Sequence, residues 1–99
     1  MRHRLFFHIV WTTRARAPLI DLDGANFLCR TLRPVAVAQR ATVLEVGLVS
    51  THIHLLVRSH PLGNLVTMVT RMKGMTSRVA KRDGIAPISW ADGYDIETV

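Results

Sequence analysis

The sequence contains one cysteine, one tyrosine and no long apolar run, and each shortage excludes a class of protein. A lone cysteine, Cys29, permits no internal disulfide, which argues against a small secreted scaffold and favours a reducing compartment. No apolar run approaches the ~18 to 20 residues of a membrane span. The basic and apolar start of the chain is too short for a signal peptide, and it runs into Arg14 and Arg16 instead of a small-residue cleavage site. We therefore expect a cytoplasmic protein without a membrane segment, in which Cys29 is a small buried apolar residue.

Acidic residues are scarce and unevenly placed. Seven Asp and Glu stand against thirteen Lys and Arg, for a formal net charge of +6. Glu45 is the one acid between Gly24 and Arg82, and the first twenty residues contain four arginines and no acid. Such an excess of positive charge attracts polyanions, among which nucleic acid is the commonest in the cytoplasm. The charge alone does not identify a partner. With 99 residues and 48% apolar content, residues 1–99 are expected to form one folded domain.

Hydrophobic periodicity predicts four strands and two helices. Residues 4–12 are aromatic and β-branched, and the alternation places Leu5, Phe7, Ile9 and Trp11 on one face. Pro34 lies inside the first predicted helix, where it predicts a kink or a restart. Methionines at helical spacing in the second helix are interpreted as core. The other expected elements are a helix from a cap at Asp21 or Asp23 to about Arg40, strands over 42–50 and 52–59 joined by a tight hairpin, a helix with Leu65, Met68, Met72, Met75 and Val79 on one stripe, and a strand from about Gly93.

The expected order of elements is β-α-β-β-α-β. This order is typical of the ferredoxin-like α+β fold, a four-stranded antiparallel sheet with both helices on one face. Nothing in the sequence is left to cover the other face. That face is therefore the expected place for a binding site.

Two histidines lie one residue apart in the segment STHIHLLVR, residues 50–58. Side chains at i and i+2 of a strand point the same way, with Cα atoms roughly 6.5 to 7 Å apart. His52 and His54 should therefore project from the open face, while Ile53, Leu55 and Val57 point to the helices. Two imidazoles so placed reach a single divalent cation. The pattern alone favours the simpler interpretation, two polar residues that face water on an open sheet face.

Several segments in a fixed order resemble the single-tyrosine HUH transposases and their relatives associated with repetitive extragenic palindromes. They span nearly the whole chain: FFHIVWTTRARAPLI, VLEVGLVSTHIHLLVRSHP, MVTRMKGMTSRVAKR and SWADGYDIETV. The resemblance implies a metal-dependent enzyme that nicks and rejoins single-stranded DNA during transposition. It implies that His52 and His54 hold a divalent cation, Mg²⁺ or Mn²⁺, and that a tyrosine attacks the scissile phosphate. It also implies a homodimer and a single-stranded or hairpin DNA partner.

The chain departs from the family pattern at the nucleophile. In the family the catalytic tyrosine lies on a helix after the last strand, whereas Tyr94 matches the Gly-Tyr of the strand motif. We therefore expect a domain that lacks the C-terminal tyrosine helix, assign no catalytic residue, and expect that it does not cleave alone. A second departure is Thr51, which stands where the family has Asp or Asn before the first histidine.

The expected phosphate contacts are basic side chains of loops, strands and the second helix. They are Lys73, as the first candidate, with Arg14, Arg16, Arg58, Arg71 and Arg78. Two other functions stay open: a non-catalytic module that binds a DNA hairpin or single strand, and a ferredoxin-like interaction domain with an incidental histidine pair.

Overall fold

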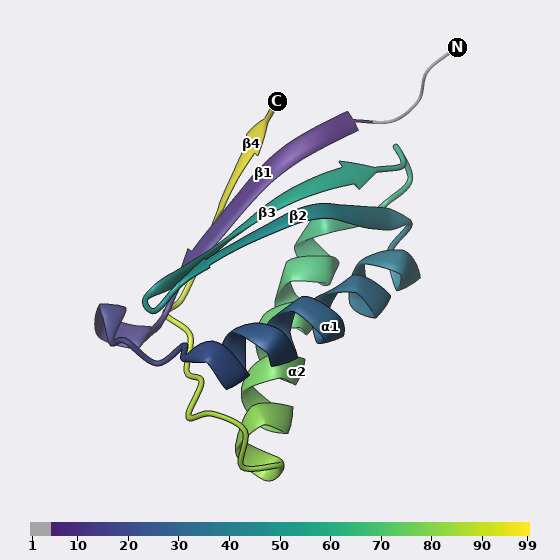
Figure 1. Cartoon of the computed structure of the whole chain (residues 1–99). Coiled ribbons are helices and arrows are strands. Elements are labelled where there is room, and N and C mark those ends of the chain that lie inside the picture. The colour runs from purple at the N-terminus through teal and green to yellow at the C-terminus, as the bar shows by residue number, and fades with distance from the viewer. Residues whose placement is uncertain (1–4) are drawn as a thin grey trace.

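A computed structural model describes residues 5–99 as one four-stranded sheet with two helices against one of its faces (Figure 1). The strands follow the order β2-β3-β1-β4 across the sheet, and all neighbours are antiparallel. This confirms the βαββαβ arrangement. No helix in the described part of the chain is long and apolar enough to cross a membrane. The elements are β1 (Leu5–Thr12), the short helical turn η1 (Arg14–Arg16), α1 (Leu22–Ala38), β2 (Ala41–Val49), β3 (His52–Ser59), α2 (Leu65–Arg82) and β4 (Asp95–Thr98).

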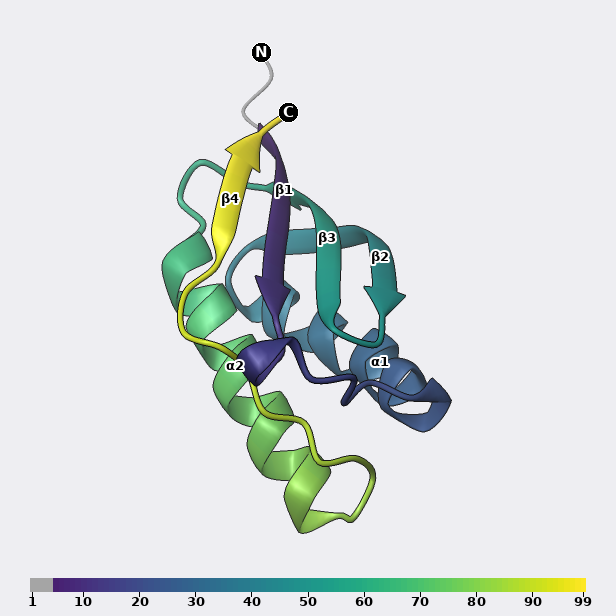
Figure 2. The ribbon, with the colours of Figure 1, turned by 90° about the vertical axis from the view of Figure 1, so that its left-hand side faces the viewer.

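The two central strands, β1 and β3, supply the middle of the core. In their register Ile9 faces Leu55 and Trp11 faces Ile53, and none of the four side chains is more than 2% exposed. The residues between them point the other way, because side chains alternate along a strand. Figure 2 looks onto this second face, which no helix covers. We call it the open face.

Helix α1 begins where the sequence predicts it and continues through its proline. The Asp21 carboxylate accepts a hydrogen bond of 2.8 Å from the backbone N–H of Gly24, which caps the first turn. The helix is continuous from Leu22 to Ala38, so the predicted restart at Pro34 is wrong. Pro34 is exposed, on the side of the helix away from the core. Cys29 is also exposed, which corrects its expected burial.

Helix α2 buries the face that carries its methionines. Met68 and Met72 are fully buried, and the half-buried Val79 packs against the core. This confirms the interpretation of the methionine stripe as core at Met68 and Met72, whereas the half-buried Met75 lines the groove between α1 and α2. The Asn64 side chain caps the helix by accepting from the N–H of Thr67 at 2.9 Å.

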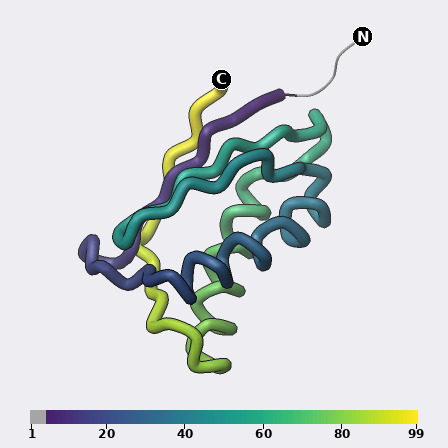
Figure 3. The backbone as a smooth tube through the Cα atoms, in the orientation of Figure 1, coloured from purple at the N-terminus to yellow at the C-terminus, as the bar shows by residue number. Residues whose placement is uncertain are grey.

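In the segment from the end of α2 to β4, Trp90 packs into the core. Figure 3 shows the chain running back along α2 before it enters β4. Trp90 is 7% exposed, and its ring meets that of Trp11 edge to face with centroids 5.8 Å apart. Its indole N–H donates to the hydroxyl of Thr76, at 3.0 Å. This buried hydrogen bond anchors the return segment to α2.

Replacing Thr76 by valine should therefore destabilise the fold. The Thr76→Val variant keeps the shape but leaves the Trp90 indole N–H without its acceptor, at a cost of about 1–3 kcal/mol. Urea denaturation measures the change in the free energy of unfolding. Thr70→Val is the matched control, because Thr70 bonds the carbonyl four residues back in the same way but is exposed. Equal losses for the two variants would contradict the anchoring role.

Candidate metal and DNA site

The two histidines lie side by side on the open face, as the sequence predicts. His54 is exposed and His52 half-exposed, and their ring centroids are 4.9 Å apart. Ile53, between them, is fully buried on the opposite face. Both rings therefore lie next to one another on the solvent-facing side of the sheet. The pair is suited to bind one divalent cation from two sides.

Thr51 orients the first imidazole. Its hydroxyl lies 3.1 Å from Nδ1 of His52. When Nδ1–H donates to this hydroxyl, the lone pair of Nε2 points outward and is available to a metal. Threonine thus occupies the outer-shell position that a carboxylate or amide would otherwise take. It does so as a neutral group, without the negative charge of a carboxylate.

The residues beside His54 on the neighbouring strands leave its imidazole accessible. The neighbours of His54 across the strands are Gly47 on β2 and Val10 on β1, and Asp95 of β4 lies beyond Val10. Asp95 is two strand spacings from His54, with Val10 between them in the row across the strands. Within residues 5–99 no three His, Cys, Asp or Glu side chains gather closely enough to hold a metal. The pair fits a divalent cation as two nitrogen ligands, and oxygen ligands from elsewhere would complete the shell.

Tyr94 lies on the other side of the sheet. It precedes Asp95, an open-face residue, and its half-buried ring packs against the core. The sheet therefore separates the Tyr94 hydroxyl from the histidine pair. That Tyr94 has no catalytic role stays a prediction.

The six predicted phosphate contacts do not form one patch. Arg14 and Lys73 line a hollow of about 300 Å³ beside α2, and Arg71 and Arg78 line a groove of about 540 Å³ between α1 and α2. Arg58 lies on the open face, and Arg16 belongs to η1. The backbone N–H of Thr13 bonds the carbonyl of Thr51 at 2.9 Å, so η1 and the hollow lie at the His52 end of the sheet.

Lys73 is partly engaged within the chain. Its ammonium donates to the carbonyls of Ala91 and Gly93, at 2.7 and 2.9 Å. Burial lowers the pKa of Lys73 below its usual value, and the nearby charge of Asp92 partly opposes that shift. Two of the three ammonium hydrogens thus hold the segment before β4. A phosphate contact by Lys73 stays a prediction, made with the remaining hydrogen.

Sequence reasoning missed a further basic cluster. Arg40, Thr42, Arg58 and His60 line a hollow of about 340 Å³ at the end of the open face away from His52. Only Arg58 was expected to bind a ligand. Equal spacing from the turn at Ser50 and Thr51 would pair Arg58 with Val43, so Thr42 joins this cluster only through the register shift between Val43 and Glu45. The sequence contains no local signal for that shift.

Comparisons with known proteins identify relatives of this chain. The family model described as "Transposase IS200 like" matches residues 1–99. Among solved structures, a candidate transposase of Deinococcus radiodurans R1 superposes with a TM-score of 0.84 at 22% identity, covering 100% of this chain and 82% of that one. A REP-associated tyrosine transposase bound to a REP hairpin has a TM-score of 0.71 at 12% identity, covering 100% of this chain and 58% of that one. At these identities the structures show a shared fold. No curated protein sequence matches the chain.

Gly47 should control access to His54. A Cβ at Gly47 would lie 3.6 Å from that of His54, an ordinary contact, so Gly47→Val is compatible with the strand. The added side chain would cover the base of the imidazole and slow its modification by diethyl pyrocarbonate, measured by mass spectrometry. His60 serves as the internal reference and Thr42→Val as the control variant. Unchanged reactivity of His54 would show that Gly47 does not set its exposure.

Thr51 should matter to metal affinity through His52. Removal of an outer-shell partner typically costs 10- to 100-fold in affinity, and this neutral partner belongs at the lower end, about 10-fold. Thr51→Val should therefore weaken binding of Mn²⁺, followed by calorimetry. Thr42→Val, on the same face but far from the pair, should leave it unchanged. Equal affinities for Thr51→Val and the parent protein would remove Thr51 from the site.

Proposed function

The chain belongs to the family of IS200-like transposases, and from this premise we propose that it binds one DNA strand on its open face and presents a phosphodiester to a divalent cation held by His52 and His54. The observation that carries the proposal is the adjacent placement of the two imidazoles, with ring centroids 4.9 Å apart, on the face that no helix covers. A bound Mg²⁺ or Mn²⁺ would stabilise the negative charge that develops on the phosphate oxygens in the transition state.

The residues of this chain bind and position the substrate in this proposal. His52 and His54 supply nitrogen ligands, and Thr51 fixes the orientation of the first ring. Arg14 lies at the same end of the sheet as His52, and its exposed guanidinium is suited to bind the backbone on that side. The net charge of +6 draws the strand in by long-range attraction.

We infer that the attacking hydroxyl does not come from Tyr94, because the sheet lies between it and the histidines. Residues 1–99 contain no other tyrosine. The nucleophile would then be supplied by another segment or another chain. In this reading residues 1–99 are the metal and DNA platform of the reaction and do not cleave DNA alone.

The proposal includes a homodimer in the cytoplasm. The outer edges of β2 and β4 are unpaired within the sheet, and such edges join readily to a second copy. A DNA-binding module without catalysis is the second candidate, which the position of Tyr94 favours.

The histidine variants should separate metal binding from DNA binding. Loss of one of two protein ligands should weaken Mn²⁺ binding by more than roughly 10-fold in His52→Ala and in His54→Ala, since even outer-shell losses reach that size. Calorimetry measures this, with His60→Ala as the control about 20 Å along the strand. Unchanged Mn²⁺ affinity in both variants would refute the metal site.

DNA binding should persist in those variants and fall with salt. Fluorescence anisotropy of a labelled hairpin oligonucleotide with a single-stranded tail gives the affinity between about 50 and 200 mM salt. On a plot of the logarithm of the binding constant against the logarithm of the salt concentration, the slope should be about −0.7 for each phosphate contact to a single strand. No binding at the lowest salt would refute the DNA platform and leave an interaction domain.

A further inference from the structure

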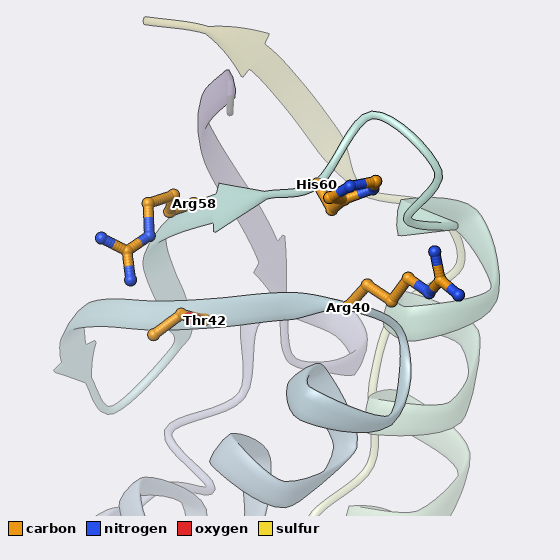
Figure 4. A pocket seen from close by; sticks show the side chains of 4 residues that line it. All are labelled: Arg40, Thr42, Arg58 and His60. Carbon is orange, nitrogen blue, oxygen red and sulfur yellow. The ribbon is translucent and has the colours of Figure 1, made fainter. Parts of the chain in front are cut away.

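The hollow lined by Arg40, Thr42, Arg58 and His60, which we call the basic pocket, is built by the register of the β2–β3 hairpin. Thr42 is the cross-strand partner of Arg58, and the backbone N–H of His60 bonds the carbonyl of Arg40 at 3.0 Å. The four residues therefore form two neighbouring pairs. Figure 4 shows Arg58 and Thr42 at one end of the hollow and His60 and Arg40 at the other.

A strand irregularity turns the β2 half of this pocket outward. The register shifts between Val43 and Glu45, which adds one residue to β2. Val43 consequently stays in the core at 5% exposure, while Thr42 joins the face of Arg58. Without the extra residue Val43 would face Arg58, and the pocket would have an apolar wall.

Every side chain that lines the pocket can donate a hydrogen bond. Nδ1 of His60 accepts from the backbone N–H of Leu62 at 3.0 Å, so a neutral His60 carries its proton on Nε2 and donates with it. Thr42 adds a hydroxyl, and the two guanidinium groups add fixed positive charge. No carboxylate lines the pocket, and the one ion pair within residues 5–99 joins Arg82 to Asp83 elsewhere. An oxyanion is the complementary ligand.

An exposed aromatic ring beside the pocket indicates where the oxyanion comes from. Phe6 of β1 is paired with Arg58 on the open face and is 41% exposed. A nucleobase stacks on such a ring while its backbone follows neighbouring basic groups. Free phosphate makes no stacking contact with Phe6, whereas a DNA strand contacts both the Phe6 ring, through a base, and the basic pocket, through a phosphate.

We propose that the basic pocket binds a backbone phosphate of single-stranded DNA, with an adjacent base stacked on Phe6. The inference rests on the proposed DNA function and adds a second anchor to it. Arg58 is four residues beyond His54, about 13 Å along β3, so one phosphate cannot reach both sites. The strand held at the histidine pair therefore runs along β3 and is fixed again at the pocket.

The double variant Arg40→Gln/Arg58→Gln tests this anchor. Binding of a labelled oligothymidylate should weaken roughly tenfold at low salt, and the salt slope should flatten by about 0.7 to 1.4, the contribution of one or two contacts. The matched control is Arg30→Gln/Arg33→Gln, which removes the same charge from exposed positions of α1. Thermal unfolding verifies that both proteins are folded.

Two further arms identify the ligand. Phe6→Ala should weaken binding of the oligothymidylate several-fold and leave unchanged the amide NMR shifts that inorganic phosphate induces at Thr42 and His60. If Phe6→Ala has no effect on DNA while inorganic phosphate saturates the pocket, the pocket is a site for free phosphate and the proposal is overturned.

The DNA-binding measurements distinguish failure of the basic pocket from failure of the proposed function. If the parent protein binds the oligothymidylate and the two double variants bind it equally well, the pocket is refuted and the DNA function stands. If the parent protein binds no DNA at low salt, the proposed function itself fails.

Discussion

The register of β3 between its two neighbours is the constraint on which the site depends. Ile53, Leu55 and Val57 are at most 1% exposed, and burial of each such side chain contributes about 1.5–3 kcal/mol. A shift of one residue would exchange the two faces of the strand and bring the imidazoles into the core. The core therefore decides where His52 and His54 point, although neither histidine contributes to it.

The same alternation explains how much of the molecule could be predicted from the sequence. The β1 and β3 patterns, the two-residue hairpin and the methionine stripe of α2 each depend on periodicity over neighbouring residues, and the structure confirms all three. Both histidines were placed on the correct face for this reason. Periodicity says nothing of function. The prediction of a transposase came from the family resemblance, and the family model that matches residues 1–99 confirms that resemblance.

The features that were missed depend on contacts between distant segments. The irregularity between Val43 and Glu45 has no local signature in the sequence, yet it decides that Thr42 and Arg40 belong to the open face. Lys73 meets the carbonyls of Ala91 and Gly93 only because the return segment passes beside α2. Periodicity also does not determine whether a single small residue is buried or exposed. Cys29 was expected to be buried and is exposed.

The distribution of charge on the open face leaves one path for a nucleic-acid backbone. Asp95 and Glu97 lie on β4 at one edge, and Glu45 lies on β2 at the other. Carboxylates at both edges repel phosphates, which raises the free energy of any path along β2 or β4. The central strands carry no acid on this face, because β1 and β3 contain none at all. In the proposed function, a DNA strand bound at the histidines would thereby be confined to the centre of the sheet, along a path that leads to Arg58.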